Sequence, residues 1–147
     1  MRIVVQRSLK SSVTVDNKIV GKIDSGLVLL VGFTEGDDIN DINYMVKKVV
    51  NLRIFDDEEG VMNKSILDVG GDILSISQFT LYGDTKKGNR PSYIKALKAD
   101  EASKLYAKFN EELSKFVHVE TGIFQALMKV SIENDGPTTI LLESEAK

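Results

Sequence analysis

A short, unbroken apolar run between two glycines limits the folds open to this chain more than any other feature. The run, residues 25–33, reads SGLVLLVGF and contains no charged residue. It is far too short to cross a bilayer, which takes about 20 residues. A continuous apolar run of this length is typical of a β-strand buried on both faces. The sequence therefore predicts a buried strand here.

The rest of the chain alternates between strand and helix patterns. Apolar residues recur at three- and four-residue steps in two segments, which predicts amphipathic helices over about 38–52 and 100–116, the second capped by Asp100. Strand patterns cover residues 2–7, 12–23, 72–77, 126–133 and 138–143, and the second of these is a hairpin that turns at Asp16 and Asn17. We expect one α+β domain over residues 1–147, with two main helices and a largely antiparallel sheet curled toward a barrel.

The amino-acid composition limits the kinds of catalysis and of metal binding that this chain could support. The chain has 147 residues, no cysteine and one histidine, His118, so disulfides and thiolate catalysis are excluded and a metal site would need mostly carboxylates. We expect no metal and no cofactor. The N-terminus lacks the pattern of a signal peptide and no membrane-spanning run is present, so we expect a cytoplasmic protein. The net charge of −3 means that a nucleic acid would have to be held by a local basic patch.

One strand ends in an unusual group of polar residues. The stretch DILSISQFTLYGD, residues 72–84, starts as a buried strand and then places Ser77, Gln78 and Thr80 around Phe79. Buried polar groups are costly unless they are paired, so this group needs either backbone partners or a ligand. A nucleophilic hydroxyl would need a nearby base, and the sequence shows none. The pattern favours substrate positioning and stabilisation of an oxyanion by backbone N–H groups.

Two other segments each allow two interpretations. The loop GDTKKGNRPSY carries Lys86, Lys87 and Arg90, and is either a solvated loop or a holder of phosphates next to the polar strand end. The segment NDGP, residues 134–137, is either a plain turn or part of a site, since an X-Pro bond readily becomes cis and a glycine permits unusual backbone geometry.

Taken together, these motifs resemble those of the D-aminoacyl-tRNA deacylases, also called D-tyrosyl-tRNA deacylases. The resemblance runs over nearly the whole chain and in one order: QR at 6–7, SVTV at 12–15, RIF at 53–55, MN at 62–63, SQFT at 77–80, RPS at 90–92 and NDGP at 134–137. One departure follows the proline, where Thr138 and Thr139 stand in place of the more usual Val-Thr.

The resemblance implies an enzyme that hydrolyses the ester of D-aminoacyl-tRNA and releases free tRNA, and that also acts on glycyl-tRNA. It implies a homodimer whose active site lies at the subunit interface. One subunit would supply Ser77–Thr80. The other would supply Gly136 and Pro137, joined by a cis bond, whose rigid loop leaves no room for an L side chain.

Residue roles follow from the same resemblance. Thr80 and the backbone N–H groups of Phe79 and Thr80 would face the ester carbonyl, and the tRNA 2′-hydroxyl would assist the reaction. Ser77 and Gln78 would fix the loop and the ribose, and Arg7 would brace the Gly-Pro loop. Two further residues match positions that line the pocket, although a core role is equally open: Phe124 and Met128.

Lys86, Lys87 and Arg90 would hold the acceptor end of the tRNA. Three alternatives remain open: a sibling deacylase that acts on L-aminoacyl-tRNA, a non-catalytic dimer that binds nucleic acid, and a hydrolase of free amino-acid esters.

Overall fold

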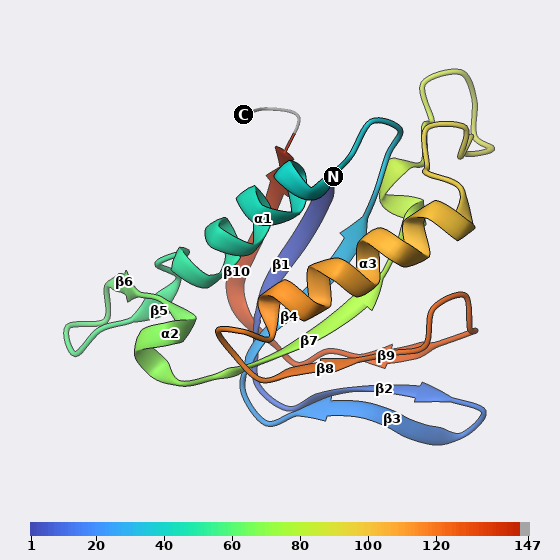
Figure 1. Cartoon of the computed structure of the whole chain (residues 1–147). Coiled ribbons are helices and arrows are strands. Elements are labelled where there is room, and N and C mark those ends of the chain that lie inside the picture. Colours follow the sequence, from blue (N-terminus) through green and yellow to red (C-terminus); the bar gives the residue numbers. More distant parts are fainter. Residues whose placement is uncertain (145–147) are drawn as a thin grey trace.

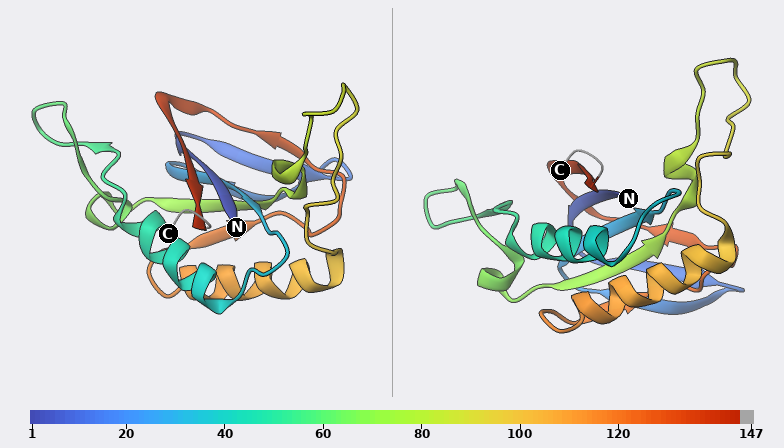
Figure 2. Two further views of the ribbon diagram at one scale, coloured as in Figure 1. Left: turned by 90° about the horizontal axis from the view of Figure 1, so that it is seen from above. Right: turned by 45° about the horizontal axis from the view of Figure 1, so that its top comes forward.

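The computed structural model describes residues 1–144 and arranges them in three layers (Figures 1 and 2). Helices cover one face of a five-stranded sheet, and a three-stranded sheet packs on part of the other face. The elements in chain order are β1 (Arg2–Ser8), β2 (Ser11–Val15), β3 (Lys18–Ile23), β4 (Gly26–Gly32), α1 (Ile39–Asn51), β5 (Phe55–Asp56), β6 (Met62–Lys64), α2 (Ile66–Val69), β7 (Asp72–Ser77), the 3-10 helix η1 (Phe79–Tyr82), α3 (Ala99–Leu113), β8 (Val119–Thr121), β9 (Lys129–Ser131) and β10 (Asn134–Glu143).

The five-stranded sheet is mixed, although most strand pairings in the described chain are antiparallel, as expected. Its order is β10-β1-β4-β7-β8, with β1 antiparallel to β10 and β4, and with β7 parallel to β4 and β8. Parallel neighbours need a crossover connection, and α1 lies within the connection from β4 to β7. The sheet does not close into a barrel, since β10 and β8 are its two edges.

The predicted hairpin and the two long helices are present. The hairpin joins β2 to β3 through Asp16 and Asn17, which both have positive φ values of 49° and 65°, as a tight two-residue hairpin turn requires. Asp38 caps α1 in a capping box with Asp41. The predicted cap of the second helix is wrong: α3 begins at Ala99 after its cap Lys98 and ends at Leu113, and Asp100 lies inside its first turn, where a carboxylate favours the helix dipole.

Two apolar cores fill the spaces between the three layers. The larger core lies between the helices and the five-stranded sheet, and its fully buried side chains include Leu27 and Leu29 of β4 and Phe109 of α3. The smaller core lies between the two sheets around Val28, Leu74 and neighbouring residues. Strand β4 contributes to both cores, so the prediction of a strand buried on both faces is confirmed.

Part of the five-stranded sheet has no covering layer within the described chain. Val4 pairs with Leu141, and Gln6 pairs with Thr139. Directly paired residues point to the same face of a sheet. All four residues therefore lie on the face that the three-stranded sheet covers at β4 and β7, but β1 and β10 lie beyond the part that this sheet covers. Leu141 is 56% exposed there. We call this region, defined by Val4, Gln6, Thr139 and Leu141, the open sheet face.

No helix among residues 1–144 is long and apolar enough to cross a membrane.

Candidate functional site

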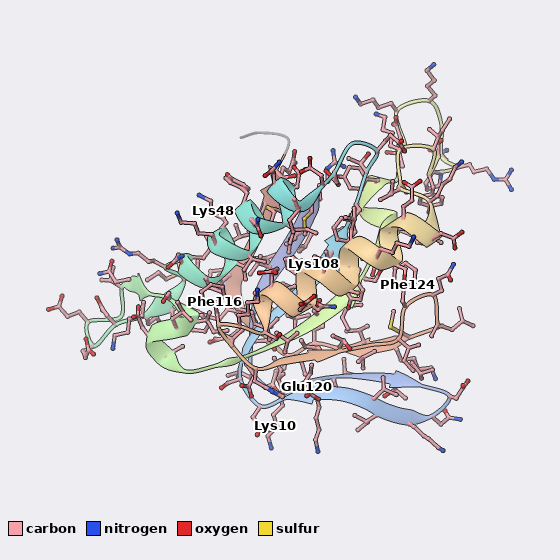
Figure 3. The ribbon with its side chains drawn as sticks, in the orientation of Figure 1. Lys10, Lys48, Lys108, Phe116, Glu120 and Phe124 are labelled. Atoms are coloured by element: carbon pink, nitrogen blue, oxygen red, sulfur yellow. The ribbon has the colours of Figure 1, made fainter. Side chains whose placement is uncertain are left out.

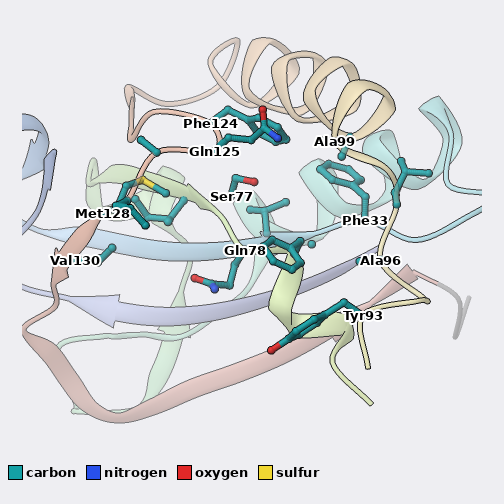
Figure 4. Close-up of a pocket in the computed structure, with 18 residues that line it drawn as sticks. Phe33, Ser77, Gln78, Tyr93, Ala96, Ala99, Phe124, Gln125, Met128 and Val130 are labelled. Carbon is teal, nitrogen blue, oxygen red and sulfur yellow. The ribbon is translucent and has the colours of Figure 1, made fainter. Parts of the chain in front are cut away.

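A cavity of about 630 Å³ opens at the end of β7. Its walls come from the ends of β4 and β7, the start of α3 and the segment between β8 and β9 (Figure 4). Ser77, Gln78, Phe79, Phe124 and Met128, all singled out from the sequence, line it. Its other lining residues are largely apolar, as is usual for a small-molecule site with a few polar groups.

The cavity exists because two parallel strands part. Strand β8 pairs with β7 only up to Ser75 and Thr121, after which the chain turns away and leaves the last residues of β7 without this neighbour. Gly122, at this turn, packs closely against Met128, since a Cβ there would lie 2.5 Å from the sulfur of Met128. The departing segment then forms the far wall, and Figure 3 shows Phe124 on it next to α3.

The polar group of β7 lies where the strand ends. The backbone N–H of Gln78 still donates to the carbonyl of Val31 at 2.7 Å, and the chain then enters the helical turn η1. The side-chain amide of Gln78 donates to the Thr80 hydroxyl at 2.5 Å. Thr80 itself is exposed beside the cavity and does not line it. The first N–H groups of a helical turn have no acceptor inside that turn, so those of Phe79 and Thr80 have no acceptor within η1.

Tyr106 holds two walls of the cavity in place, the end of β7 and the segment that carries Phe124. The sequence analysis did not single it out as a site residue. Its hydroxyl donates to the carbonyl of Ser75 at 2.8 Å, at the last residue that β8 pairs. Its ring packs against that of Phe124 with centroids 6.0 Å apart. In the sequence, Tyr106 occupies a position on the apolar face of α3, like the other core residues of this helix. Only the fold shows that its hydroxyl binds the end of β7.

Apolar and basic groups lie at the mouth of the cavity. The rings of Phe79 and Tyr93 meet edge to face at 5.2 Å, and Leu127 is 95% exposed. Tyr93 follows a loop that Asp84 and Ser92 close through two backbone hydrogen bonds of 2.8 and 2.9 Å. This loop stands out from the body of the molecule (Figure 1). Its three cationic side chains are all exposed: Lys86, Lys87 and Arg90.

Asp84 anchors this basic loop electrostatically. Its carboxylate accepts the backbone N–H of Lys86 at 3.0 Å and pairs with the ammonium of Lys95 at 3.2 Å. These contacts, the backbone hydrogen bond first and Lys95 second, hold the pKa of Asp84 below its usual value. Asp84 therefore stays ionised near neutral pH and fixes the base of the loop.

Gly136 and Pro137 lie far from the cavity of their own chain. The start of β10 pairs with Ser8 at one end of β1, whereas the cavity lies by Gly32, which pairs with Arg2 at the other end. The six residue steps between Arg2 and Ser8 span roughly 20 Å. The Gly136–Pro137 peptide bond is cis.

Arg7 lies beneath this loop. Its guanidinium donates to the carbonyl of Asp135 at 3.2 Å and to that of Ile54 at 3.0 Å. It also pairs with the carboxylates of Asp56 and Asp135 at 3.3 and 3.2 Å. Arg7 is only 8% exposed, and a buried guanidinium needs such partners.

Nothing within the described chain requires a glycine at position 136. Its φ is not positive, so the unusual backbone geometry that a glycine permits is not used here. A Cβ there would meet only the side-chain oxygen of Asn134, at an ordinary 3.6 Å. A need for glycine at this exposed position would therefore come from something outside the chain.

The described part of the chain brings no three His, Cys, Asp or Glu side chains together in a way that would hold a metal ion. Its cavity instead combines apolar walls with the amide of Gln78 and the first residue of η1, Phe79, and the Thr80 hydroxyl lies beside it in contact with that amide. Such a site can hold an apolar or ring-shaped group and direct hydrogen-bond donors at a carbonyl or a developing oxyanion.

Comparisons with known proteins identify related chains. The family model described as D-Tyr-tRNA(Tyr) deacylase matches residues 4–143. D-aminoacyl-tRNA deacylases of Bacillus cereus and Bacillus cytotoxicus are each 58% identical over 146 residues, covering 99% of this chain and 100% of theirs.

Two solved structures have the same fold. A protein described as c-Myc DNA unwinding element binding protein matches with a TM-score of 0.93 and 40% identity, covering 97% of this chain and 98% of its own. A probable eukaryotic D-amino acid tRNA deacylase matches with a TM-score of 0.81 over 96% of this chain and 97% of its own, and at 19% identity it shows the fold alone.

The contact between Tyr106 and Ser75 gives a pH-dependent prediction. Burial raises the pKa of the Tyr106 hydroxyl above its ordinary 10.0, against smaller opposing effects of hydrogen bonds, the Ser75 side chain first. Above pH 10 the unfolded chain loses this proton while the folded chain keeps it, so the free energy of unfolding falls as the pH rises. Chemical unfolding of Tyr106→Phe will show a smaller fall above pH 10.

At neutral pH the same variant will be less stable by about 1–3 kcal/mol, because the buried carbonyl of Ser75 loses its donor. Tyr93→Phe, which alters an exposed ring, is the matched control and will leave stability nearly unchanged. Equal pH dependence in the wild type and in Tyr106→Phe would contradict the role given to this hydroxyl.

Proposed function

We infer, because this chain belongs to the D-Tyr-tRNA(Tyr) deacylase family, that it is an enzyme that hydrolyses the ester bond of D-aminoacyl-tRNA. The products are free tRNA and a D-amino acid. The observation that carries the proposal to particular residues is the cavity at Ser77, Gln78 and Phe79, with Thr80 held at its rim. A tRNA substrate implies that the enzyme works in the cytoplasm.

We propose that the active site is shared between two copies of the chain. Two observations support this: Gly136 and Pro137 lie about 20 Å along β1 from the cavity, and the open sheet face exposes Leu141. In a twofold dimer that buries this face, with the axis running across the strands, each copy's strands run opposite to its partner's. The loop end of one subunit then meets the cavity end of the other.

In this arrangement the ester carbonyl lies at the rim of the cavity. The N–H groups of Phe79 and Thr80 would donate to the oxyanion that forms when water attacks, and a donor of this kind lowers the barrier by roughly 3–4 kcal/mol. The bond from Gln78 to Thr80 keeps the hydroxyl aimed at the substrate. The Thr80 hydroxyl is bonded to the amide of Gln78, which cannot act as a general base, so we assign Thr80 a positioning role and give the assisting role to the 2′-hydroxyl of the tRNA.

The enzyme would distinguish D from L substrates by excluding the L side chain. The partner's Gly136 and Pro137 would face the amino group and the chiral centre, and would leave no space where an L side chain points. A D side chain would point outward and escape contact, so many amino acids would be accepted. Glycine has no side chain to exclude, so glycyl-tRNA would be hydrolysed as well.

The basic loop is the proposed contact for the tRNA acceptor end. Lys86, Lys87 and Arg90 are exposed on a loop that is anchored next to Phe79 through Tyr93. Contacts between cations and phosphates release counterions, so the affinity for tRNA would fall steeply with salt.

The proposal is tested by following ester loss from one tRNA charged with D-tyrosine, L-tyrosine or glycine. We predict that the protein speeds hydrolysis of the D-tyrosyl and glycyl esters and leaves the L-tyrosyl ester at its spontaneous rate. Hydrolysis of the L ester would favour the sibling deacylase. Binding of tRNA with no ester loss would favour a nucleic-acid-binding dimer, and equal activity on free amino-acid esters would favour a simple esterase.

The shared site makes a second prediction about the open sheet face. Leu141→Asp places a charge at the centre of the proposed interface, so we expect a monomer with little activity on D-tyrosyl-tRNA. Ile19→Asp is the matched control, because Ile19 is 62% exposed on β3, outside that face. Light scattering reports the mass of each variant. A fully active Leu141→Asp monomer would contradict the shared site.

A further inference from the structure

Asn134 holds both ends of the loop that carries Gly136 and Pro137. Its side-chain nitrogen donates to the carbonyl of Arg7 at 3.0 Å and to that of Thr138 at 3.1 Å. The first bond reaches across to β1, and the second spans the loop to the residue after the proline. One amide group therefore joins the strand, the start of the loop and its end.

The strand register explains why the loop needs this connection. Gln6 pairs with Thr139 and Ser8 pairs with Asn134, so one residue of β1 lies opposite four residues of β10. The loop, residues 135–138, thus protrudes from a ladder that is interrupted on both strands. A backbone carbonyl without its ladder partner needs another donor, and the amide of Asn134 supplies one to each strand.

An amide suits this position chemically, and a carboxylate of the same shape does not. An asparagine side chain offers two N–H donors and a carbonyl acceptor, whereas an ionised aspartate of the same shape offers acceptors alone. Both carbonyls at the base of the loop require donors. The remaining oxygen of Asn134 lies on the side of Gly136, 3.6 Å from where a Cβ would stand.

Arg7 and Asn134 hold different parts of the loop. Arg7 binds the carbonyl of Asp135, at the beginning of the protrusion. Asn134 binds the carbonyl of Thr138, at its end. Loss of the Asn134 amide would leave the beginning fixed and remove the hydrogen bond at the end, which directly follows Pro137.

We propose that Asn134 is a positioning residue that sets the shape of the Gly136–Pro137 loop and thereby the enzyme's choice between D and L substrates. The inference rests on the proposed function, in which this loop excludes L side chains. A loop that is held less firmly at one end leaves space where the clash should be, so it admits L-aminoacyl groups while the cavity of the partner stays intact.

The test uses the full-length dimer with Asn134→Ala and Asn134→Asp, the second keeping the shape of the side chain without its donors. Hydrolysis rates are measured on D-tyrosyl-tRNA and L-tyrosyl-tRNA. We expect the ratio of D to L rates to fall by about tenfold or more, since each lost hydrogen bond at a fixed loop weakens discrimination. A general loss of folded protein lowers both rates together and leaves their ratio unchanged.

Asn51 provides the matched control. Its amide nitrogen donates to the carbonyl of Lys47 at 2.8 Å, on the exposed side of α1. Asn51→Ala and Asn51→Asp remove the same kind of bond elsewhere, and we expect the D-to-L ratio of the wild type. Thermal unfolding and light scattering identify which variants are folded dimers, and either Asn134 variant alone suffices for the comparison.

The outcomes separate this inference from the function on which it rests. A wild type that hydrolyses only the D ester, with Asn134 variants that also hydrolyse the L ester, supports both. A selective wild type whose folded Asn134 variants keep the full D-to-L ratio overturns the role of Asn134 and leaves the proposed function standing. A wild type that hydrolyses neither ester overturns both.

Discussion

The directions of the strands in the five-stranded sheet decide how this chain can build a site. Strand β1 is antiparallel to both β4 and β10, and β7 is parallel to β4. The end of β7 and the start of β10 therefore lie at opposite ends of the sheet. No side-chain movement spans roughly 20 Å, so residues from both ends can act on one substrate only if they come from different copies of the chain.

Each end is built from an interruption of the sheet that other residues stabilise. At one end β8 leaves β7, and Tyr106 donates to the last paired carbonyl while the departing chain forms the wall of the cavity. At the other end β10 bulges away from β1, and Arg7 and Asn134 satisfy the carbonyls of the loop. In both places a side-chain donor binds a backbone carbonyl at the interruption, where the regular ladder cannot supply all the donors.

Local patterns in the sequence predicted the elements better than their arrangement. The buried run of β4, the turn at Asp16 and Asn17, and the period of α1 are local signals, and all three are confirmed. The parallel pairing of β7 was missed, because strand order depends on a crossover that no short pattern records. Ser77 and Gln78 were found as polar residues in an apolar strand. Tyr106 and Asn134 were missed, because each acts through a residue distant in sequence or through the register of a bulge.

Mixed dimers test the shared site most directly. One chain carries Gln78→Ala and Thr80→Ala, and the other carries Gly136→Phe, at an exposed position where a Cβ meets only Asn134 in its own chain. Each homodimer should be inactive on D-tyrosyl-tRNA. Refolding the two together should restore about a quarter of wild-type activity, since half of the dimers are mixed and each of these has one intact site. A mixture that stays inactive, from two folded dimers that exchange subunits, would show that each site is built within one chain.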